Sequence, residues 1–244
     1  MSLRITLAVA ARVLTQLRRD HRTLAMLLVL PCLVIALLWW MFTDLPGRGF
    51  DALAPALLAL IPFIVMFLVT SVTTLRERTS GTLERLLAMP LGKGDFLLGY
   101  ALAFGLVAAA QSALAVTVAT VFLDLSLEGP VWMLLVVAVL DAILGSALGL
   151  FVSAFARTEF QAVQFMPALV FPQILLCGLF VDRDLLPSFL DGVSRALPLT
   201  YAVDAMSSVA DHAHPSIAAD LLVIVAFTAA ALVLGALTLR RQTD

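Results

Sequence analysis

Charged residues are scarce in this sequence. They make up 13% of the 244 residues, whereas hydrophobic residues make up 62%, and the mean hydropathy is +1.06. In soluble globular domains the apolar share is only about 45–50%. The composition therefore excludes a soluble globular domain and predicts an integral membrane protein.

Cysteine is also scarce. The two cysteines, Cys32 and Cys177, lie inside apolar runs, so they cannot build an extracellular disulfide framework or a four-ligand zinc site. We interpret them as small core hydrophobes. His212 and His214 could ligate a metal together with Asp211, but a turn of this composition is most often only a turn. We expect no metal site.

A phosphate-binding loop is missing as well. The one Gly-Lys pair, Gly92-Lys93, has Leu87 where the first glycine of that motif is needed and Gly94 where Ser or Thr should follow. We therefore expect that the chain is not an enzyme and binds no cofactor. If ATP drives this protein, ATP and Mg²⁺ must bind to a separate partner subunit.

Residues 1–22 are predicted to form an amphipathic helix. Five arginines are spread along the segment, and it lacks the short hydrophobic region and cleavage site of a signal peptide. Such a helix lies in the membrane surface with its arginines toward anionic headgroups; a cytoplasmic helix packed on protein is the alternative. On a helical wheel its apolar side consists of Leu3, Leu7, Val9, Ala10, Val13, Leu14 and Leu17.

Long apolar runs dominate the rest of the chain. Each run is close to or above the roughly 20 residues that span a bilayer, so the sequence predicts an all-α protein with six transmembrane helices. The prolines at 31, 62, 167 and 172 should kink their spans. The predicted spans are 24–42, 52–75, 96–123, 131–156, 160–181 and 217–239.

Basic residues favour one side of this arrangement. Of the 15 lysines and arginines, all but Arg48, Arg183 and Arg195 fall on the side that holds both termini and the loop after the second span. The positive-inside rule therefore places that side in the cytoplasm. The outer segment 182–216 is half apolar, which predicts one or two short re-entrant helices between Leu185 and Met206, with prolines 187 and 198 at their turns.

The segment 75–96, LRERTSGTLERLLAMPLGKGDF, is a charged island between two long apolar runs. Within it, Thr82–Met89 has helical composition, Gly81 loosens the chain before it and Pro90 stops it. This short helix could dock into a groove of a soluble partner. It could also rest on lipid headgroups, because charged loops between spans are common.

Polar residues inside the spans are few. Asp141 is the carboxylate in the middle of a predicted span, and an intramembrane charge costs at least about 2.5–3.5 kcal/mol, so it should face the bundle interior and be protonated. Asp141 either takes part in proton transfer or substrate binding or makes a structural hydrogen bond.

Gly145, Gly149 and Ser153 form a small-residue stripe that lets a neighbouring helix approach. The glutamines Gln111, Gln161, Gln164 and Gln173 line a polar path or bond across helices.

Two blocks resemble the ABC type-2 exporter permeases of the daunorubicin-resistance class. The first is ERTSGTLERLLAMPLGKGDFLLGYALA, with Glu77-Arg78, Gly81 to Glu84 and Met89-Pro90 as matching elements. The second runs from Leu148 to Met206 and includes Cys177 to Phe180 and Leu197 to Tyr201. With the amphipathic N-terminus and the six spans, the resemblance covers essentially the whole chain.

The resemblance implies a fold and partners. In that family the loop at 76–95 holds a coupling helix that seats in a cleft of a separate ATPase subunit, and the outer segment forms re-entrant helices. A permease of this kind pairs with a second permease copy, identical or related, and with two ATPase subunits. The residues expected at the ATPase contact are Arg78, Thr82, Leu83, Glu84, Arg85, Leu86, Leu87, Met89 and Pro90.

We expect the permease subunit of an ATP-binding cassette exporter, involved in efflux or multidrug resistance and located in a bacterial-type inner membrane with both termini cytoplasmic. Its substrate would be an amphipathic drug, lipid or lipid-linked molecule. The alternatives are a proton-coupled secondary transporter that uses Asp141 or a non-transport membrane scaffold. The residues expected along the substrate path are Gln111, Asp141, Gln161, Gln164 and Gln173.

Overall fold

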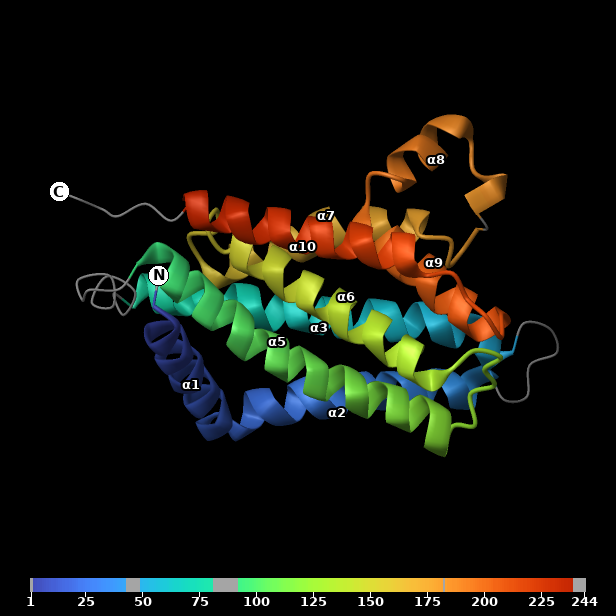
Figure 1. Ribbon diagram of the computed structural model, residues 1–244, viewed down its shortest axis with the longest axis horizontal. Helices are drawn as coiled ribbons and strands as arrows, with labels where there is room; N and C mark the ends of the chain where they lie inside the picture. Colours follow the sequence, from blue (N-terminus) through green and yellow to red (C-terminus); the bar gives the residue numbers. More distant parts are fainter. Residues whose placement is uncertain (1, 43–48, 81–91, 182, 239–244) are drawn as a thin grey trace.

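The computed structural model describes residues 2–42, 49–80, 92–181 and 183–238, and every regular element in these ranges is a helix (Figure 1). The predicted all-α class is therefore confirmed. The expected coupling helix, Thr82–Met89, lies outside the described residues. The elements are α1 (Leu3–Arg19), α2 (His21–Phe42), α3 (Phe50–Thr79), α5 (Lys93–Thr117), the π-helical turn η1 (Val118–Phe122), α6 (Val131–Val152), α7 (Glu159–Leu176), the 3₁₀ turn η2 (Arg183–Leu185), α8 (Ser188–Ser194), α9 (Pro198–Asp211) and α10 (Ala218–Thr238).

Among these elements, five helices are long and apolar enough to cross a membrane: α2, α3, α5 with η1, α6 and α10. They correspond to five of the six predicted spans. The sixth prediction falls on α7, which has 18 residues and is not one of the five. It ends at Leu176 rather than at Val181, because Gly178 adopts a left-handed backbone with φ of 95° that an α-helix does not contain.

Helix α6 is the centre of the bundle. It packs against α3, α5 and α10, and Figure 1 shows it between α10 on one side and α5 on the other. The contact with α3 is the closest, because a Cβ atom added at Gly145 would lie 2.5 Å from the carbonyl oxygen of Phe63, and one added at Gly149 would lie 2.5 Å from that of Phe67. The predicted small-residue stripe is therefore confirmed as the face that receives α3.

The ends of two spans differ from the prediction. Helix α6 ends at Val152 instead of residue 156, because residues 153–155 form a turn in which the hydroxyl of Ser153 donates to the carbonyl of Leu150. Helix α3 runs from Phe50 to Thr79 and is longer than the predicted 52–75, so its last turn carries charged residues beyond the apolar run.

Helix α1 packs along α5 with one face. Its buried residues include Val9, Val13 and Leu17, which join the aromatic side chains of α5 in one apolar cluster. Two residues of the predicted apolar side, Leu3 and Leu7, are not covered in this way and are 76% and 49% exposed. The apolar side of this helix is broader than the strip that α5 covers, so packing on protein still leaves an exposed apolar edge.

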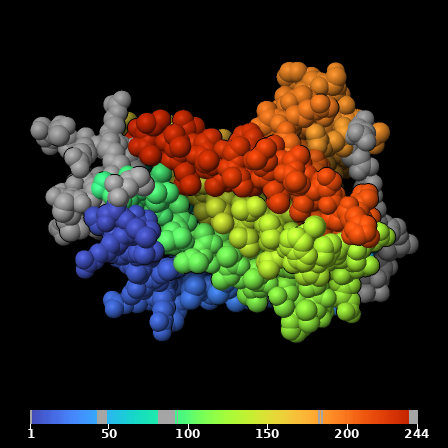
Figure 2. Space-filling view, in the orientation of Figure 1, coloured from blue at the N-terminus to red at the C-terminus, as the bar shows by residue number. Residues whose placement is uncertain are grey.

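The predicted helices of segment 182–216 are present as α8 and α9. Pro187 precedes α8 and Pro198 is the first residue of α9, which confirms both expected turns. Helix α9 is mostly buried and packs against α3, α6 and α10. Helix α8 stands away from the bundle, at the end opposite to α1 (Figures 1 and 2).

The close approach of α3 and α6 generates a prediction. We expect Gly145→Ala to lower the melting temperature of the detergent-solubilised protein, since the new methyl group would overlap the Phe63 carbonyl and force two backbones apart. Overpacking of this kind costs about 1–3 kcal/mol.

A matched control is Gly105→Ala on α5. The added Cβ there would meet its nearest atom, in Ile143 of α6, at an ordinary 3.8 Å. Equal melting temperatures for the two variants would show that the glycines do not set the distance between α3 and α6.

Candidate functional site

The end of α3 is bonded to side chains of α1 and α7 and to the backbone of the residue that follows α6. It is the point from which the charged island continues, and it lies at the same end of the bundle as α1 (Figure 1). We call this the arginine-rich end, because most of the described arginines gather there, among them Arg12, Arg76, Arg78 and Arg157.

The first tie joins α1 to α3. Arg12 donates a hydrogen bond from Nη2 to Oε1 of Glu77 over 3.2 Å, and the two side chains are 34% and 6% exposed. The second carboxylate oxygen of Glu77 and Nη1 of Arg12 are buried and have no hydrogen-bond partner among the described residues. Glu77 is therefore a nearly buried carboxylate whose ion-pair partner is Arg12 of α1.

Two further ties fix α3 to α7 and α6. Arg76 donates from Nε and Nη2 to the two carboxylate oxygens of Glu159 over 2.9 and 3.0 Å. These hydrogen bonds lower the pKa of Glu159 below its ordinary value. Arg78 donates from Nη1 to the carbonyl oxygen of Ser153 over 3.0 Å. The end of α3 thus cannot move without disturbing α1, α6 and α7.

Asp95 connects the beginnings of α1 and α5. Its carboxylate accepts hydrogen bonds from the backbone N–H of Ser2 at 2.8 Å, from the hydroxyl of Thr6 at 3.3 Å and from the backbone N–H of Gly92 at 3.3 Å. No role for Asp95 was predicted from the sequence. Its position three residues after Gly92, as in a capping box, was the available signal for the bond within α5, but the bonds to α1 had none.

Of the nine residues expected at the ATPase contact, only Arg78 lies in the described part of the chain. Arg78 is described, and its guanidinium bonds to the bundle rather than projecting from it. The remaining eight expected residues lie between 81 and 91, outside the described part of the chain. Their role stays a prediction.

Asp141 and Gln111 lie in the interior, as expected. Both are fully buried, Asp141 on α6 and Gln111 on α5. The contact between their helices passes through Ser112, whose hydroxyl donates to the carbonyl of Ala138 over 3.1 Å, one turn from Asp141. All four side-chain polar atoms of Asp141 and Gln111 are without a hydrogen-bond partner among the described residues. Unpartnered buried polar groups are costly and rare.

The three glutamines of α7 differ in burial and in hydrogen-bond partners. Gln173 is buried and accepts a hydrogen bond from the backbone N–H of Leu199 over 3.3 Å, so it satisfies a donor in the first turn of α9. Gln161 bonds to the backbone N–H of Arg157 over 2.8 Å at the start of its own helix. Gln161 and Gln164 are exposed. The structure therefore does not gather the expected path residues into one cavity.

The histidines near the end of α9 show no metal-site geometry. Within the described ranges, no group of three or more His, Cys, Asp and Glu side chains could hold a metal ion. A ring nitrogen of His212 lies 3.2 Å from the carbonyl oxygen of Ser208, one turn earlier in the same helix.

Comparison with known proteins agrees on one class of membrane protein. Residues 5–210 match the model of a family described as ABC-2 type transporter. The chain is 28% identical to ABC transporter G family member 20 of Dictyostelium discoideum, over 67% of the chain and 22% of that protein. It is 26% identical to the probable multidrug ABC transporter permease YbhR of Escherichia coli, over 70% of the chain and 46% of that protein. The matches therefore span less than half the length of these curated relatives.

The tie between α1 and α3 gives a testable asymmetry. We expect Arg12→Leu to destabilise the protein more than Glu77→Leu, because the first change leaves a nearly buried carboxylate unpaired and the second leaves a partly exposed arginine. The loss for Arg12→Leu should be at most about 3–5 kcal/mol. Melting of the detergent-solubilised protein measures it.

The double variant Arg12→Leu/Glu77→Leu should melt above Arg12→Leu alone, since it removes both charges together. Arg4→Leu, at an exposed arginine of the same helix, is the control and should have little effect. Strictly additive losses for the two single changes would contradict the pairing.

Proposed function

Because this chain belongs to the ABC-2 type transporter family, we propose that it is the transmembrane permease subunit of an ATP-binding cassette exporter. The observation that carries the proposal is the family match, which extends from α1 to α9 and so includes every helix of the described chain except α10.

The energy source would be a separate ATPase subunit in two copies, with ATP and Mg²⁺ bound there. This sequence has no phosphate-binding loop, and its one Gly-Lys pair lacks the flanking residues that such a loop needs. The charged island is the proposed docking segment for that subunit. The island continues from the end of α3, which is bonded to three neighbouring helices through Glu77, Arg76 and Arg78. A displacement of the island would therefore be transmitted to the whole arginine-rich end.

The arginine-rich end would face the cytoplasm of a bacterial-type cell, following the positive-inside rule. Helix α7 would be the sixth membrane span. Gln161 and Gln164 are exposed on it, and exposed polar side chains on a lipid-facing helix are unfavourable. A second permease copy that covers α7 would remove this cost, so these glutamines support dimerisation and a polar path between the two copies.

The substrate would be amphipathic, such as a drug, a lipid or a lipid-linked molecule. One relative is named as a probable multidrug permease, which supports this class. Binding of ATP to the partner would move the two islands, and the paired bundles would rock between inward and outward openings.

A proton-coupled carrier that uses Asp141 is the alternative, and one observation favours it. The carboxyl group of Asp141 is fully buried in the central helix and without a hydrogen-bond partner among the described residues. Intramembrane carboxylates of this kind occur in proton relays.

The proposed function predicts that the purified chain hydrolyses no ATP and that export in vesicles requires ATP and a copurifying ATPase subunit. Glu84→Arg in the island should abolish export, because a charge reversal there disrupts the docking surface. Glu128→Arg, a charge reversal at an exposed carboxylate of the opposite end, should leave export unchanged. ATP hydrolysis by the chain alone would overturn the permease assignment.

Asp141→Asn distinguishes the two candidate functions. Asparagine keeps the shape and hydrogen bonding of a protonated carboxyl, so an ATP-driven exporter should keep at least about half of its transport rate, whereas a proton-driven carrier should lose more than about tenfold. Transport in vesicles, at equal membrane levels of the protein, measures the difference. Lost transport in Asp141→Asn together with normal transport in Glu84→Arg would favour the carrier.

A further inference from the structure

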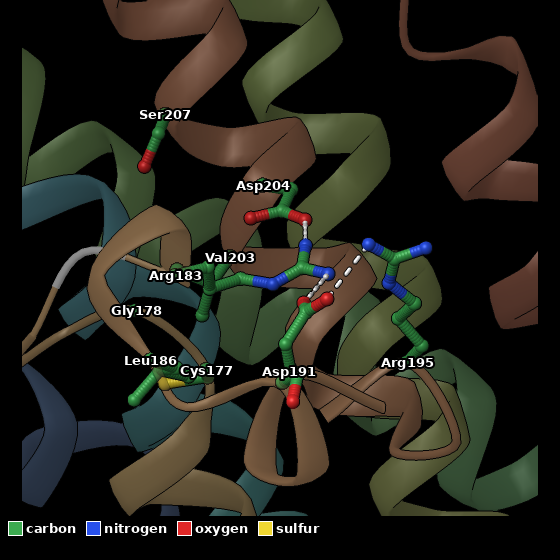
Figure 3. A pocket seen from close by; sticks show the side chains of 10 residues that line it. Cys177, Gly178, Arg183, Leu186, Asp191, Arg195, Val203, Asp204 and Ser207 are labelled. Carbon is green, nitrogen blue, oxygen red and sulfur yellow. Dashed lines mark hydrogen bonds and ion pairs between the residues drawn. The ribbon is translucent and has the colours of Figure 1, made fainter. Parts of the chain in front are cut away.

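A cavity of about 640 Å³ lies at the end of the bundle opposite to the arginine-rich end (Figure 3). Its walls come from the end of α7, from η2, from α8 and from α9. Four charged side chains line it: Arg183, Asp191, Arg195 and Asp204. We call it the α8–α9 pocket. It is separate from the α1–α3 tie and from the buried Asp141, and the proposed transport mechanism assigns it no role.

The charged side chains of the pocket form ion pairs in which arginines and aspartates alternate. Arg183 bonds to Asp204 through Nη1, and its Nη2 lies 3.6 Å from Oδ1 of Asp191. Figure 3 shows the guanidinium between these two carboxylates. The Nε atom of Arg183 is buried and has no hydrogen-bond partner among the described residues. One N–H donor of this charged group is thus left without a partner by the described residues.

Arg195 supplies a second donor group at the pocket edge. Its Nη2 donates to Oδ2 of Asp191 over 2.7 Å, while the side chain is 67% exposed. The hydroxyl of Tyr201 donates to the carbonyl oxygen of Arg195 over 2.7 Å and so fixes the backbone that bears this guanidinium. An arginine has five N–H donors, so most of those on Arg195 can still meet a ligand.

Exposed apolar side chains are close in sequence to the residues that line the pocket. Phe180, Leu185 and Phe189 are 64%, 74% and 77% exposed. These residues belong to the segment around α8, which Figure 2 shows projecting from the bundle. A pocket with paired charges inside and large apolar side chains around it matches an amphiphile at a membrane interface.

We propose that the α8–α9 pocket binds the headgroup of a phospholipid that carries both a phosphate and an ammonium group. The phosphate contacts Arg183 and Arg195, the ammonium contacts Asp191 and Asp204, and the acyl chains lie against Phe180, Leu185 and Phe189. The inference rests on the membrane orientation proposed above, which makes this the outer leaflet, and it does not depend on transport.

The balance of charge selects this chemical class. Two arginines and two aspartates line the pocket, so an anion alone would compete with the carboxylates and a cation alone would compete with the guanidinium groups. A headgroup with both charges can exchange partners with the existing ion pairs and leave no group unpaired. Each arginine then gains a phosphate oxygen while each aspartate gains an ammonium donor.

The test is a titration of the purified full chain in detergent micelles, read as lipid adducts in native mass spectra. The probes are short-chain phosphatidylethanolamine, phosphatidylglycerol with the same acyl chains, and free phosphoethanolamine. We expect phosphatidylethanolamine to bind about tenfold more tightly than either of the others, since the second lacks the ammonium and the third lacks the chains.

Two variants locate the site. Arg195→Gln and Phe189→Ser should each weaken phosphatidylethanolamine binding by about tenfold. Arg157→Gln and Phe160→Ser change the same residue types at exposed positions of the other end and should leave binding unchanged. Melting temperatures equal to that of the unmodified protein show that the variants are folded.

Several outcomes would overturn the proposal. Equal binding of the two lipids would remove the role of the ammonium, and equal binding of free phosphoethanolamine would point to a soluble ligand instead of a lipid. Absence of any adduct above the micelle background would show that the pocket does not bind these lipids, and the exposed side chains of Phe180, Leu185 and Phe189 would then favour a protein partner. The titration uses neither ATP nor an ATPase, so its failure would not bear on the permease assignment.

Discussion

The contact between α3 and α6 is the constraint on which the rest of this bundle depends. In a bilayer there is no hydrophobic driving force between apolar helices, so tight packing and internal hydrogen bonds must hold them together. Gly145 and Gly149 let the backbone of α3 approach α6 until carbonyl oxygens occupy the space of the missing side chains. Helices α5, α9 and α10 pack around this pair, which explains why α6 is buried along most of its length.

The two ends of the bundle use charge in different ways. At the arginine-rich end, Arg12, Arg76 and Arg78 each bind a different helix to the same short stretch, and they make the end of α3 a shared anchor. At the opposite end, Arg183 sits between two aspartates of α8 and α9 and closes a small pocket. The first arrangement suits transmission of a displacement, whereas the second suits recognition of a compact ligand with both signs of charge.

The interior polar groups place limits on any transport path. Gln173 accepts a hydrogen bond from the first turn of α9, and Gln161 accepts one from the backbone N–H of Arg157, just before its own helix, so both already have hydrogen-bond partners within one chain. Asp141 on α6 and Gln111 on α5 remain buried without a hydrogen-bond partner among the described residues. These observations agree with the proposal that a second copy completes the path along the exposed face of α7.

The sequence by itself determined the class of protein, because composition and apolar run length depend only on the residues and the thickness of a bilayer. It predicted five of the spans, the amphipathic character of α1, short helical structure with turns at Pro187 and Pro198, and the family. It could not predict that Arg12 meets Glu77, that Asp95 binds the start of α1, or that Gln173 serves α9. Those pairs join residues 26 to 93 positions apart. Hydrophobic periodicity indicates which face of a helix is buried but not which neighbour covers it, so the packing of the bundle alone decided these contacts.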